Sequence, residues 1–311
     1  MKRLPLKPML LVMMLATAFT SSTHAGDKPM KVFILAGQSN MVGYGDSTQL
    51  TEELFAESDR VLMFEDGEWQ PLRPHAPPNQ GQQRVGLTEF HFGPEIGFCN
   101  GMAEAWPDET IGVIKLAVGG TSLLAWKPDW SKEDADRVGQ GRHGSLYKQL
   151  IEKVRQADEA RDIEIVGFLW LQGGGDTKNA DVASEYLDNL KSLVSSVREE
   201  TGIADLPFIY GTMRSEGISD DLTDFEEPEE LPPGRPGAFL VLKAQFDAQQ
   251  EIPNSKMVIL RDMETYPANV HYNTVGQLAV GKLFAEAFME YVAFAFGKPP
   301  TQNQRPRPPL W

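Results

Sequence analysis

The chain has 311 residues, of which 23% are charged, and it carries a formal net charge of −15 at pH 7. So acidic a protein is a poor partner for nucleic acid or anionic membrane surfaces, because both repel it. Cys99 is the single cysteine, so no intramolecular disulfide can form. An apolar core must hold the fold, as this length permits.

Residues 1–25 are typical of a secretory signal peptide. Three basic residues precede an apolar stretch over residues 9–19, which is too short to span a bilayer. We expect cleavage after Ala25, which removes three positive charges and leaves −18. The sequence therefore predicts a secreted or periplasmic protein that has no membrane anchor after cleavage.

Short apolar runs alternate with amphipathic stretches of helix length through the rest of the chain. This alternation predicts an α/β domain over residues 26–298, with a mainly parallel sheet between two helical layers. The expected strands are Lys31–Ala36, Arg60–Phe64, Ile111–Leu116, Glu164–Trp170, Pro207–Tyr210 and Lys256–Ile259. The expected helices are Pro94–Ala105, Leu146–Ala160, Val182–Glu200, Gly237–Gln250 and Thr274–Phe296.

Two segments stand apart in composition. Residues 220–230 include seven acidic residues. A solvated surface loop is favoured there over a lid or a cation site. The proline-rich tail, residues 299–311, is expected to be extended or disordered.

The first expected strand leads into Gly37-Gln38-Ser39-Asn40-Met41. A glycine allows the sharp strand-to-helix turn that exposes a side chain at the carboxyl edge of a sheet, where open α/β folds place their sites. Ser39 is therefore a candidate nucleophile, with helix capping as the alternative role. A serine nucleophile needs a base, and His271 precedes the last helix, where it can complete such a site. The other histidines after residue 25 are His75, His91 and His143.

Two glycine-containing stretches follow the third and fourth expected strands. They are Gly119-Gly120 and Gln172-Gly173-Gly174-Gly175, and either could supply donors to an oxyanion or be a simple tight turn. Neither matches a phosphate-binding loop or a dinucleotide fingerprint. No two histidines stand at metal-ligand spacing and Cys99 is alone, so we expect no metal.

Together these stretches resemble the sequence blocks of the SGNH hydrolases, most closely the branch containing carbohydrate esterase family six and the sialate O-acetylesterases. The likeness runs in the expected order from about Lys31 to Phe296. The matching segments are Gly37 to Met41, Phe92 to Phe98, Gly119-Gly120 with Trp126, Trp170-x-Gln172-Gly173, and Val270 to Gln277.

The resemblance implies a three-layer, flavodoxin-like fold and the removal of small acyl groups, usually acetyl, from oligo- or polysaccharides without a cofactor. Ser39 would attack the ester, and His271 would act first as general base and then as general acid. The N–H groups of Ser39 and Gly120, with the Gln172 amide, would bind the oxyanion.

Two acids of the family pattern are missing. Ala268 stands where an aspartate usually precedes the histidine by three residues, and Gly174 stands where a glutamate usually follows the glutamine by two. Loss of the acid that orients the histidine can cost about 10⁴ in rate. Asp262 is the candidate third member. Glu264, Asp176 and a loop carbonyl are the alternatives.

These departures leave three hypotheses. The first is a carbohydrate acetylesterase, the second an impaired relative that binds glycans, and the third a hydrolase of a different ester, for which Gly174 would enlarge the space beside the base. Trp126 and Trp130 are candidates for stacking on a sugar, whereas Trp170 and Cys99 are expected to pack in the core.

Overall fold

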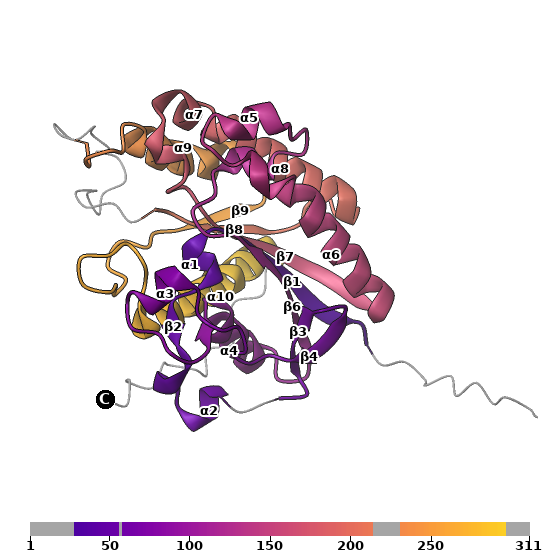
Figure 1. Ribbon diagram of the computed structural model, residues 1–311. Helices are drawn as coiled ribbons and strands as arrows, with labels where there is room; N and C mark the ends of the chain where they lie inside the picture. The colour runs from indigo at the N-terminus through magenta and orange to yellow at the C-terminus, as the bar shows by residue number, and fades with distance from the viewer. Residues whose placement is uncertain (1–27, 56–57, 214–230, 297–311) are drawn as a thin grey trace, which may run out of the picture.

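The computed structural model describes residues 28–55, 58–213 and 231–296 (Figure 1). The predicted signal peptide, the acidic segment 220–230 and the proline-rich tail lie outside the described residues. A seven-stranded sheet has the order β4-β3-β6-β1-β7-β8-β9, and all neighbours are parallel except β3 and β4. The strands are β1 Met30–Gly37, β3 Val61–Glu65, β4 Glu68–Pro71, β6 Ile111–Ala117, β7 Ile163–Leu171, β8 Phe208–Gly211 and β9 Ser255–Val258.

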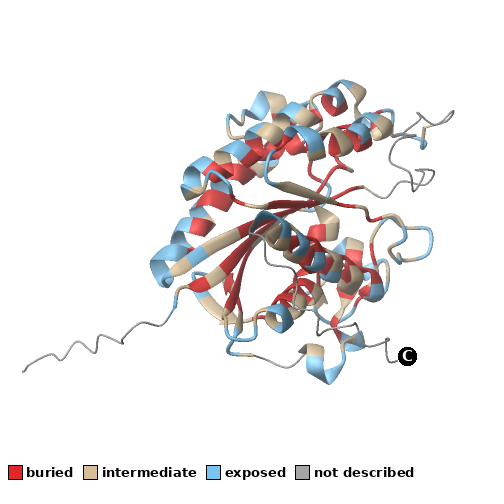
Figure 2. Ribbon diagram, turned by 180° about the vertical axis from the view of Figure 1, so that it is seen from behind, coloured by how far each residue is buried: buried red, intermediate tan, exposed pale blue. Residues whose placement is uncertain are grey.

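Two helical layers cover the sheet. One layer contains α6 (Leu146–Ala160), α8 (Tyr186–Thr201) and α9 (Ala238–Glu251), and the other contains α4 (Glu95–Ala105) and α10 (Thr274–Phe296) (Figure 1). Side chains of β1 alternate between two apolar cores, one under each layer. The central strands are accordingly buried on both faces (Figure 2). The predicted α/β fold with a mainly parallel sheet is confirmed.

Shorter elements decorate this frame. The helices are α1 Ser39–Val42, α2 Glu52–Phe55, α3 Gln80–Gln83, α5 Lys132–Asp136 and α7 Ala180–Ser184, and the 3₁₀ turns are Ser47–Gln49, Leu123–Trp126, Gly141–His143 and Asp176–Lys178. A separate pair of two-residue strands, β2 Gly45–Asp46 and β5 His91–Phe92, is antiparallel. Within the described residues, no helix combines the length and the apolar content needed to cross a bilayer.

Two features of the sheet and its helices differ from expectation. The expected helix Val182–Glu200 is broken at Glu185 into α7 and α8. Strand β4 was not expected and pairs with β3 through a tight turn, in which Asp66 and Gly67 have φ values of 49° and 85°. Positive φ at both central residues is typical of the turns that join two antiparallel strands.

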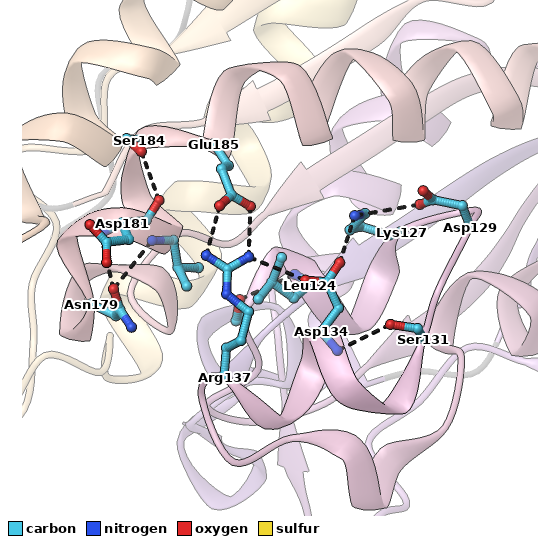
Figure 3. Close-up of polar contacts among 12 residues, drawn as sticks. Leu124, Lys127, Asp129, Ser131, Asp134, Arg137, Asn179, Asp181, Ser184 and Glu185 are labelled. Carbon is cyan, nitrogen blue, oxygen red and sulfur yellow. Dashed lines mark hydrogen bonds and ion pairs between the residues drawn. The ribbon is translucent and has the colours of Figure 1, made fainter.

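The long connection from β6 to α6 is anchored at the surface (Figure 3). The Arg137 guanidinium contacts both carboxylate oxygens of Glu185, at 3.0 and 2.7 Å, where α7 meets α8. Arg137 also reaches Asp134 at 3.2 Å, and Lys127 reaches Asp134 at 2.7 Å. These contacts tie the connection, which begins with Gly119-Gly120, to the helical layer beside it.

Candidate functional site

Ser39 is the first residue of α1, and one residue, Gln38, separates it from the end of β1. The turn requires glycine at position 37, where φ is +152° and a Cβ would lie 2.2 Å from the Leu171 carbonyl oxygen. The Gln38 N–H donates to that same oxygen at 3.0 Å, which holds the turn against the end of β7. Ser39 therefore lies at the carboxyl edge in the middle of the sheet, where open α/β folds place their sites.

The structure brings His271 to this serine across 232 residues of sequence, with Nε2 at 3.0 Å from Ser39 Oγ. Asn40 holds the histidine segment from both sides. Its Nδ2 donates to the Val270 carbonyl at 3.1 Å, and its Oδ1 accepts from the Tyr272 N–H at 3.1 Å. Asn40, the residue after Ser39, thus fixes Val270 and Tyr272, which lie on either side of His271.

The partner of the other ring nitrogen is Asn269. Its Oδ1 lies 2.7 Å from His271 Nδ1 and also accepts from the His271 backbone N–H at 3.1 Å. Asp262, predicted as the third member, is exposed and makes no hydrogen bond or ion pair with the imidazole in the part of the chain that the structure describes. Glu264 accepts from Asn273 Nδ2 instead, at 2.6 Å. Asn269, two residues before the histidine, was not among the predicted candidates, which were Asp262, Glu264, Asp176 and a loop carbonyl.

The His271 ring is packed against Tyr44, with ring centroids 3.8 Å apart and planes 5° from parallel. Burial lowers the pKa of His271 to about 4, and no neighbouring carboxylate offsets this shift. At neutral pH the imidazole is therefore uncharged, which is the state that a general base requires.

Ser39 and Gly120, whose N–H groups were predicted to bind an oxyanion, both line the same cleft. The Ser39 N–H belongs to the first residue of a helix, where no intrahelical acceptor exists. Gly119 lies beside the nucleophile, because a Cβ there would be 3.8 Å from Ser39 Cβ. Gly120 has φ +71°, and its N–H donates to no backbone acceptor among the described residues.

Gln140 holds the loop that carries Gly120. Its Nε2 donates to the Gly120 carbonyl at 2.6 Å, and its Oε1 accepts from the Ser122 N–H at 2.9 Å. The side chain is only 7% exposed. Nothing in the sequence singled out Gln140, because a glutamine twenty residues along a loop carries no motif.

Gln172 supports the same loop. Its Nε2 donates to the Thr121 carbonyl at 2.8 Å and to Asp176 Oδ2 at 2.6 Å, which uses both amide hydrogens. Its Oε1 is buried and has no partner among the described residues. The structure therefore does not show the predicted donation from Gln172 to an oxyanion.

Burial raises the pKa of Asp176 to about 6, although the carboxylate also accepts from Ser122 Oγ at 2.6 Å.

The space beside Gly174 is partly filled by Gln38. A Cβ at position 174 would lie 2.9 Å from Gln38 Nε2. Gln38 Oε1 accepts from the Gly175 N–H at 3.2 Å. An amide from the nucleophile turn thus stands next to the position where the family pattern has a glutamate.

A buried ion pair between Lys115 and Glu95 stabilises the C-terminal end of α1. Lys115 Nζ lies 2.7 Å from Glu95 Oε2 and donates to the Val42 carbonyl at 2.9 Å. Glu95 Oε1 accepts from the Gly93 N–H at 2.8 Å. The segment Phe92 to Phe98, which the resemblance included, therefore fixes the end of the helix that begins with Ser39.

A cleft of about 670 Å³ opens over Ser39 and His271. Among the described residues that line it, Lys178 and Arg235 are the cations and there is no carboxylate. Trp126 does not line the cleft. It is fully buried, packs edge-to-face on Trp170 and donates to Thr121 Oγ1 at 3.2 Å, so the prediction that it stacks on a sugar is wrong.

The remaining predicted features lie elsewhere. Trp170 and Cys99 are fully buried, which confirms that both pack in the core. Trp130 is partly exposed but is not part of the lining of the cleft. In the described segments, no group of three or more His, Cys, Asp or Glu side chains is arranged to hold a metal ion.

The sequence matches, over residues 29–290, the family described as carbohydrate esterase, sialic acid-specific acetylesterase. A probable carbohydrate esterase from Arabidopsis thaliana is 23% identical over 275 residues, which cover 84% of this chain and 91% of the relative. The X-ray structure of that Arabidopsis protein aligns with a TM-score of 0.64 and 20% identity, over 85% of this chain and 99% of its own.

Two further solved structures share the fold. NanS aligns with a TM-score of 0.58 and 16% identity, over 85% of this chain and 97% of its own. A carbohydrate acetylesterase from Xanthomonas citri aligns with a TM-score of 0.54 and 18% identity, over 86% of this chain and 57% of its own. At such identities the solved structures show that the architecture is common to these proteins.

Proposed function

The chain belongs to the carbohydrate esterase family of sialic acid-specific acetylesterases, and we propose that it removes acetyl groups from carbohydrates with Ser39 as nucleophile and His271 as base. The observation that carries this proposal is the 3.0 Å contact between Ser39 Oγ and His271 Nε2 inside the cleft. A serine at a sharp turn, hydrogen-bonded to an uncharged imidazole, is an activated nucleophile.

The proposed reaction has two steps. Ser39 Oγ attacks the acetyl carbonyl carbon while its proton passes to His271 Nε2, and the Ser39 and Gly120 N–H groups stabilise the oxyanion. The bond to the sugar oxygen then breaks as Nε2 returns the proton to that oxygen, which leaves an acetyl ester on Ser39. Water, deprotonated by the same nitrogen, attacks this ester and releases acetate and the free serine.

Within this class of substrate we propose an acidic sugar, of which the sialic acid in the family description is an example. Arg235 NH1 donates to the Gly174 carbonyl at 2.7 Å and to Thr177 Oγ1 at 2.9 Å. The other donors of the guanidinium make no hydrogen bond or ion pair with a described residue. A guanidinium held in this way is suited to a carboxylate of the substrate.

A second candidate function is glycan binding without turnover. It is favoured by one observation, the amide of Asn269 where hydrolases of this type usually have an acid. An amide cannot supply negative charge to the imidazolium that forms during the reaction.

The deciding experiment is hydrolysis of p-nitrophenyl acetate, O-acetylated sialic acid and acetylated xylan. We expect acetate release by the wild-type protein and a loss of at least roughly 10³-fold in kcat in Ser39→Ala and in His271→Ala. Matched controls are Ser196→Ala on α8 and His75→Ala, neither of which lines the cleft. Turnover that persists in Ser39→Ala contradicts the mechanism, whereas sugar binding without turnover by the folded wild type supports the second candidate.

A further inference from the structure

The orientation of the Asn269 amide is fixed by the backbone. The His271 backbone N–H can only donate, so the Asn269 atom that it meets at 3.1 Å must be the oxygen. The same oxygen lies 2.7 Å from His271 Nδ1. A hydrogen bond between Oδ1 and Nδ1 needs a proton on the ring nitrogen, because the amide oxygen has none.

This proton placement decides the state of the other ring nitrogen. An uncharged imidazole carries one N–H, so a proton on Nδ1 leaves Nε2 with a lone pair. Nε2 is the atom that lies 3.0 Å from Ser39 Oγ. The amide therefore holds His271 in the tautomer that can accept the serine proton.

Resting on the function proposed above, we propose that Asn269 is the positioning residue of a Ser39-His271-Asn269 triad, and that it fixes the tautomer of His271 without adding negative charge. The acid missing from position 268 is replaced by a neutral group two residues before the histidine. Ala268 itself adopts φ 53°, a left-handed conformation that turns the chain just before Asn269.

The groups around the imidazole agree with this assignment. Tyr44 stacks on the ring, and the Tyr266 hydroxyl donates to the Tyr44 carbonyl at 2.9 Å. Both tyrosines have a pKa above the usual value, because burial disfavours the phenolate. Arg235 and Lys178, on the cleft wall, are the charged groups of the described lining, and neither can stabilise an imidazolium.

We therefore expect the His271 imidazole to stay uncharged in mildly acidic solution. Burial lowers the pKa of His271 to about 4, and an amide at Nδ1 does not raise it again. We therefore expect the acid limb of the kcat/KM profile to lie below pH 6. A carboxylate in the same position would stabilise the imidazolium and move that limb to higher pH.

The test measures kcat/KM for p-nitrophenyl acetate from pH 4 to 9 in Asn269→Asp, Asn269→Ala and Asp262→Asn. We expect the acid limb of Asn269→Asp to move up by about one pH unit or more, with activity retained at pH 8. Asn269→Ala should lose roughly 10²–10⁴-fold in kcat, because the tautomer is no longer fixed. Asp262→Asn should follow the wild-type profile. Asn189→Asp, which adds the same charge on α8, controls for a general electrostatic effect.

A second measurement reads the ring directly and does not need turnover. Nitrogen-15 NMR of the histidine rings, assigned by comparison with His271→Gln, reports which nitrogen carries the proton and the pH at which the ring titrates. A proton on Nδ1, together with a His271 pKa that rises in Asn269→Asp, supports the proposal. This holds even when the wild type hydrolyses no ester, and that outcome would contradict only the function proposed above. An Nε2–H tautomer, or a profile that shifts in Asp262→Asn and not in Asn269→Asp, overturns it.

Discussion

Amide side chains surround Ser39 and His271. Asn40 holds the histidine segment, Asn269 meets Nδ1, and Gln140 holds the Gly120 loop. An amide offers a donor and an acceptor at fixed positions and carries no charge, so its contacts place atoms without adding charge to the site. The cleft gains its positive charge from Arg235 and Lys178 alone among the described lining residues.

Arg235 carries the prediction for substrate choice. We expect Arg235→Gln to lower kcat/KM for O-acetylated sialic acid by roughly 10–100-fold, since a charge-assisted hydrogen bond contributes about 1.5–3 kcal/mol. The loss should appear mainly in KM, because the carboxylate of the substrate is not at the reacting carbon. Hydrolysis of p-nitrophenyl acetate, which lacks a carboxylate, should change little.

Lys243→Gln, which removes an exposed charge on the same helix layer, is the matched control. An equal loss on both substrates in Arg235→Gln would point to disturbance of the Gly174 loop, to which this side chain also donates. That result would remove the support for an acidic sugar.

The roles of single residues were predictable from sequence where a local motif indicates the chemistry. They were not predictable where tertiary packing determines the position of the side chain. Ser39 and His271 were found because a serine after a strand-turn glycine and a histidine before the last helix are local patterns. The candidates for the third member were three acids and a loop carbonyl, whereas the group that contacts the ring is the side-chain amide of Asn269. Asn269 follows Ala268, whose left-handed conformation no sequence pattern predicts. Trp126 was placed at the surface, but the 3₁₀ turn Leu123–Trp126 directs it into the core against Trp170.

At the scale of elements, the connection between β6 and α6 carries Gly120, whose N–H we propose as an oxyanion donor. It leaves the sheet beside β1, passes Ser39 at Gly119, and is held on its inner side by Gln140. On its outer side Arg137 pairs with Glu185 (Figure 3). The outer ion pairs are solvent-exposed and contribute little, about 0–1 kcal/mol. The buried glutamine is the stronger anchor.

We therefore expect Gln140→Ala to lower kcat by roughly 10–100-fold with little change in KM, because the Gly120 N–H is no longer held where the oxyanion forms. Loss of two buried hydrogen bonds should also lower the free energy of unfolding by about 1–3 kcal/mol. Steady-state kinetics and urea unfolding measure the two effects. Gln149→Ala, an exposed glutamine on α6 that donates to the His143 carbonyl, should change neither.

The larger elements were predictable because each pairs an apolar run with a clear boundary. The strands and helices of both layers lie within one residue of expectation, apart from the break at Glu185. Strand β4 was missed because its run of four residues is short and polar, although Asp66-Gly67 is a recognisable turn signal. The short α and 3₁₀ turns that shape the cleft depend on contacts far apart in sequence, which no local pattern encodes.

At the scale of the whole molecule, two half-buried histidines link stability to pH. Burial, with a contribution from Lys115, lowers the pKa of His91 to about 4, and burial lowers that of His271 equally. Between pH 6.5 and 4 the unfolded chain binds protons that the folded chain does not, so stability falls as the pH falls through this range. Asp176, whose pKa is raised, acts in the opposite direction below pH 6.

We expect His91→Asn to reduce this acid destabilisation. The dependence of the unfolding free energy on pH, from urea titrations between pH 6.5 and 4.5, should correspond to up to about one fewer proton taken up on unfolding. A slope in His91→Asn equal to that of the wild type contradicts the assignment.

Ser39 follows the first strand of the sheet, and His271 precedes the last helix, with β1 paired on both sides to strands that come later in the chain. During translation, Ser39 is therefore synthesised long before His271. Contacts of such long sequence separation form late and slowly in folding. In the mechanism proposed above, a nascent or truncated chain that ends before residue 271 lacks the base for Ser39, so we expect no hydrolytic activity from it.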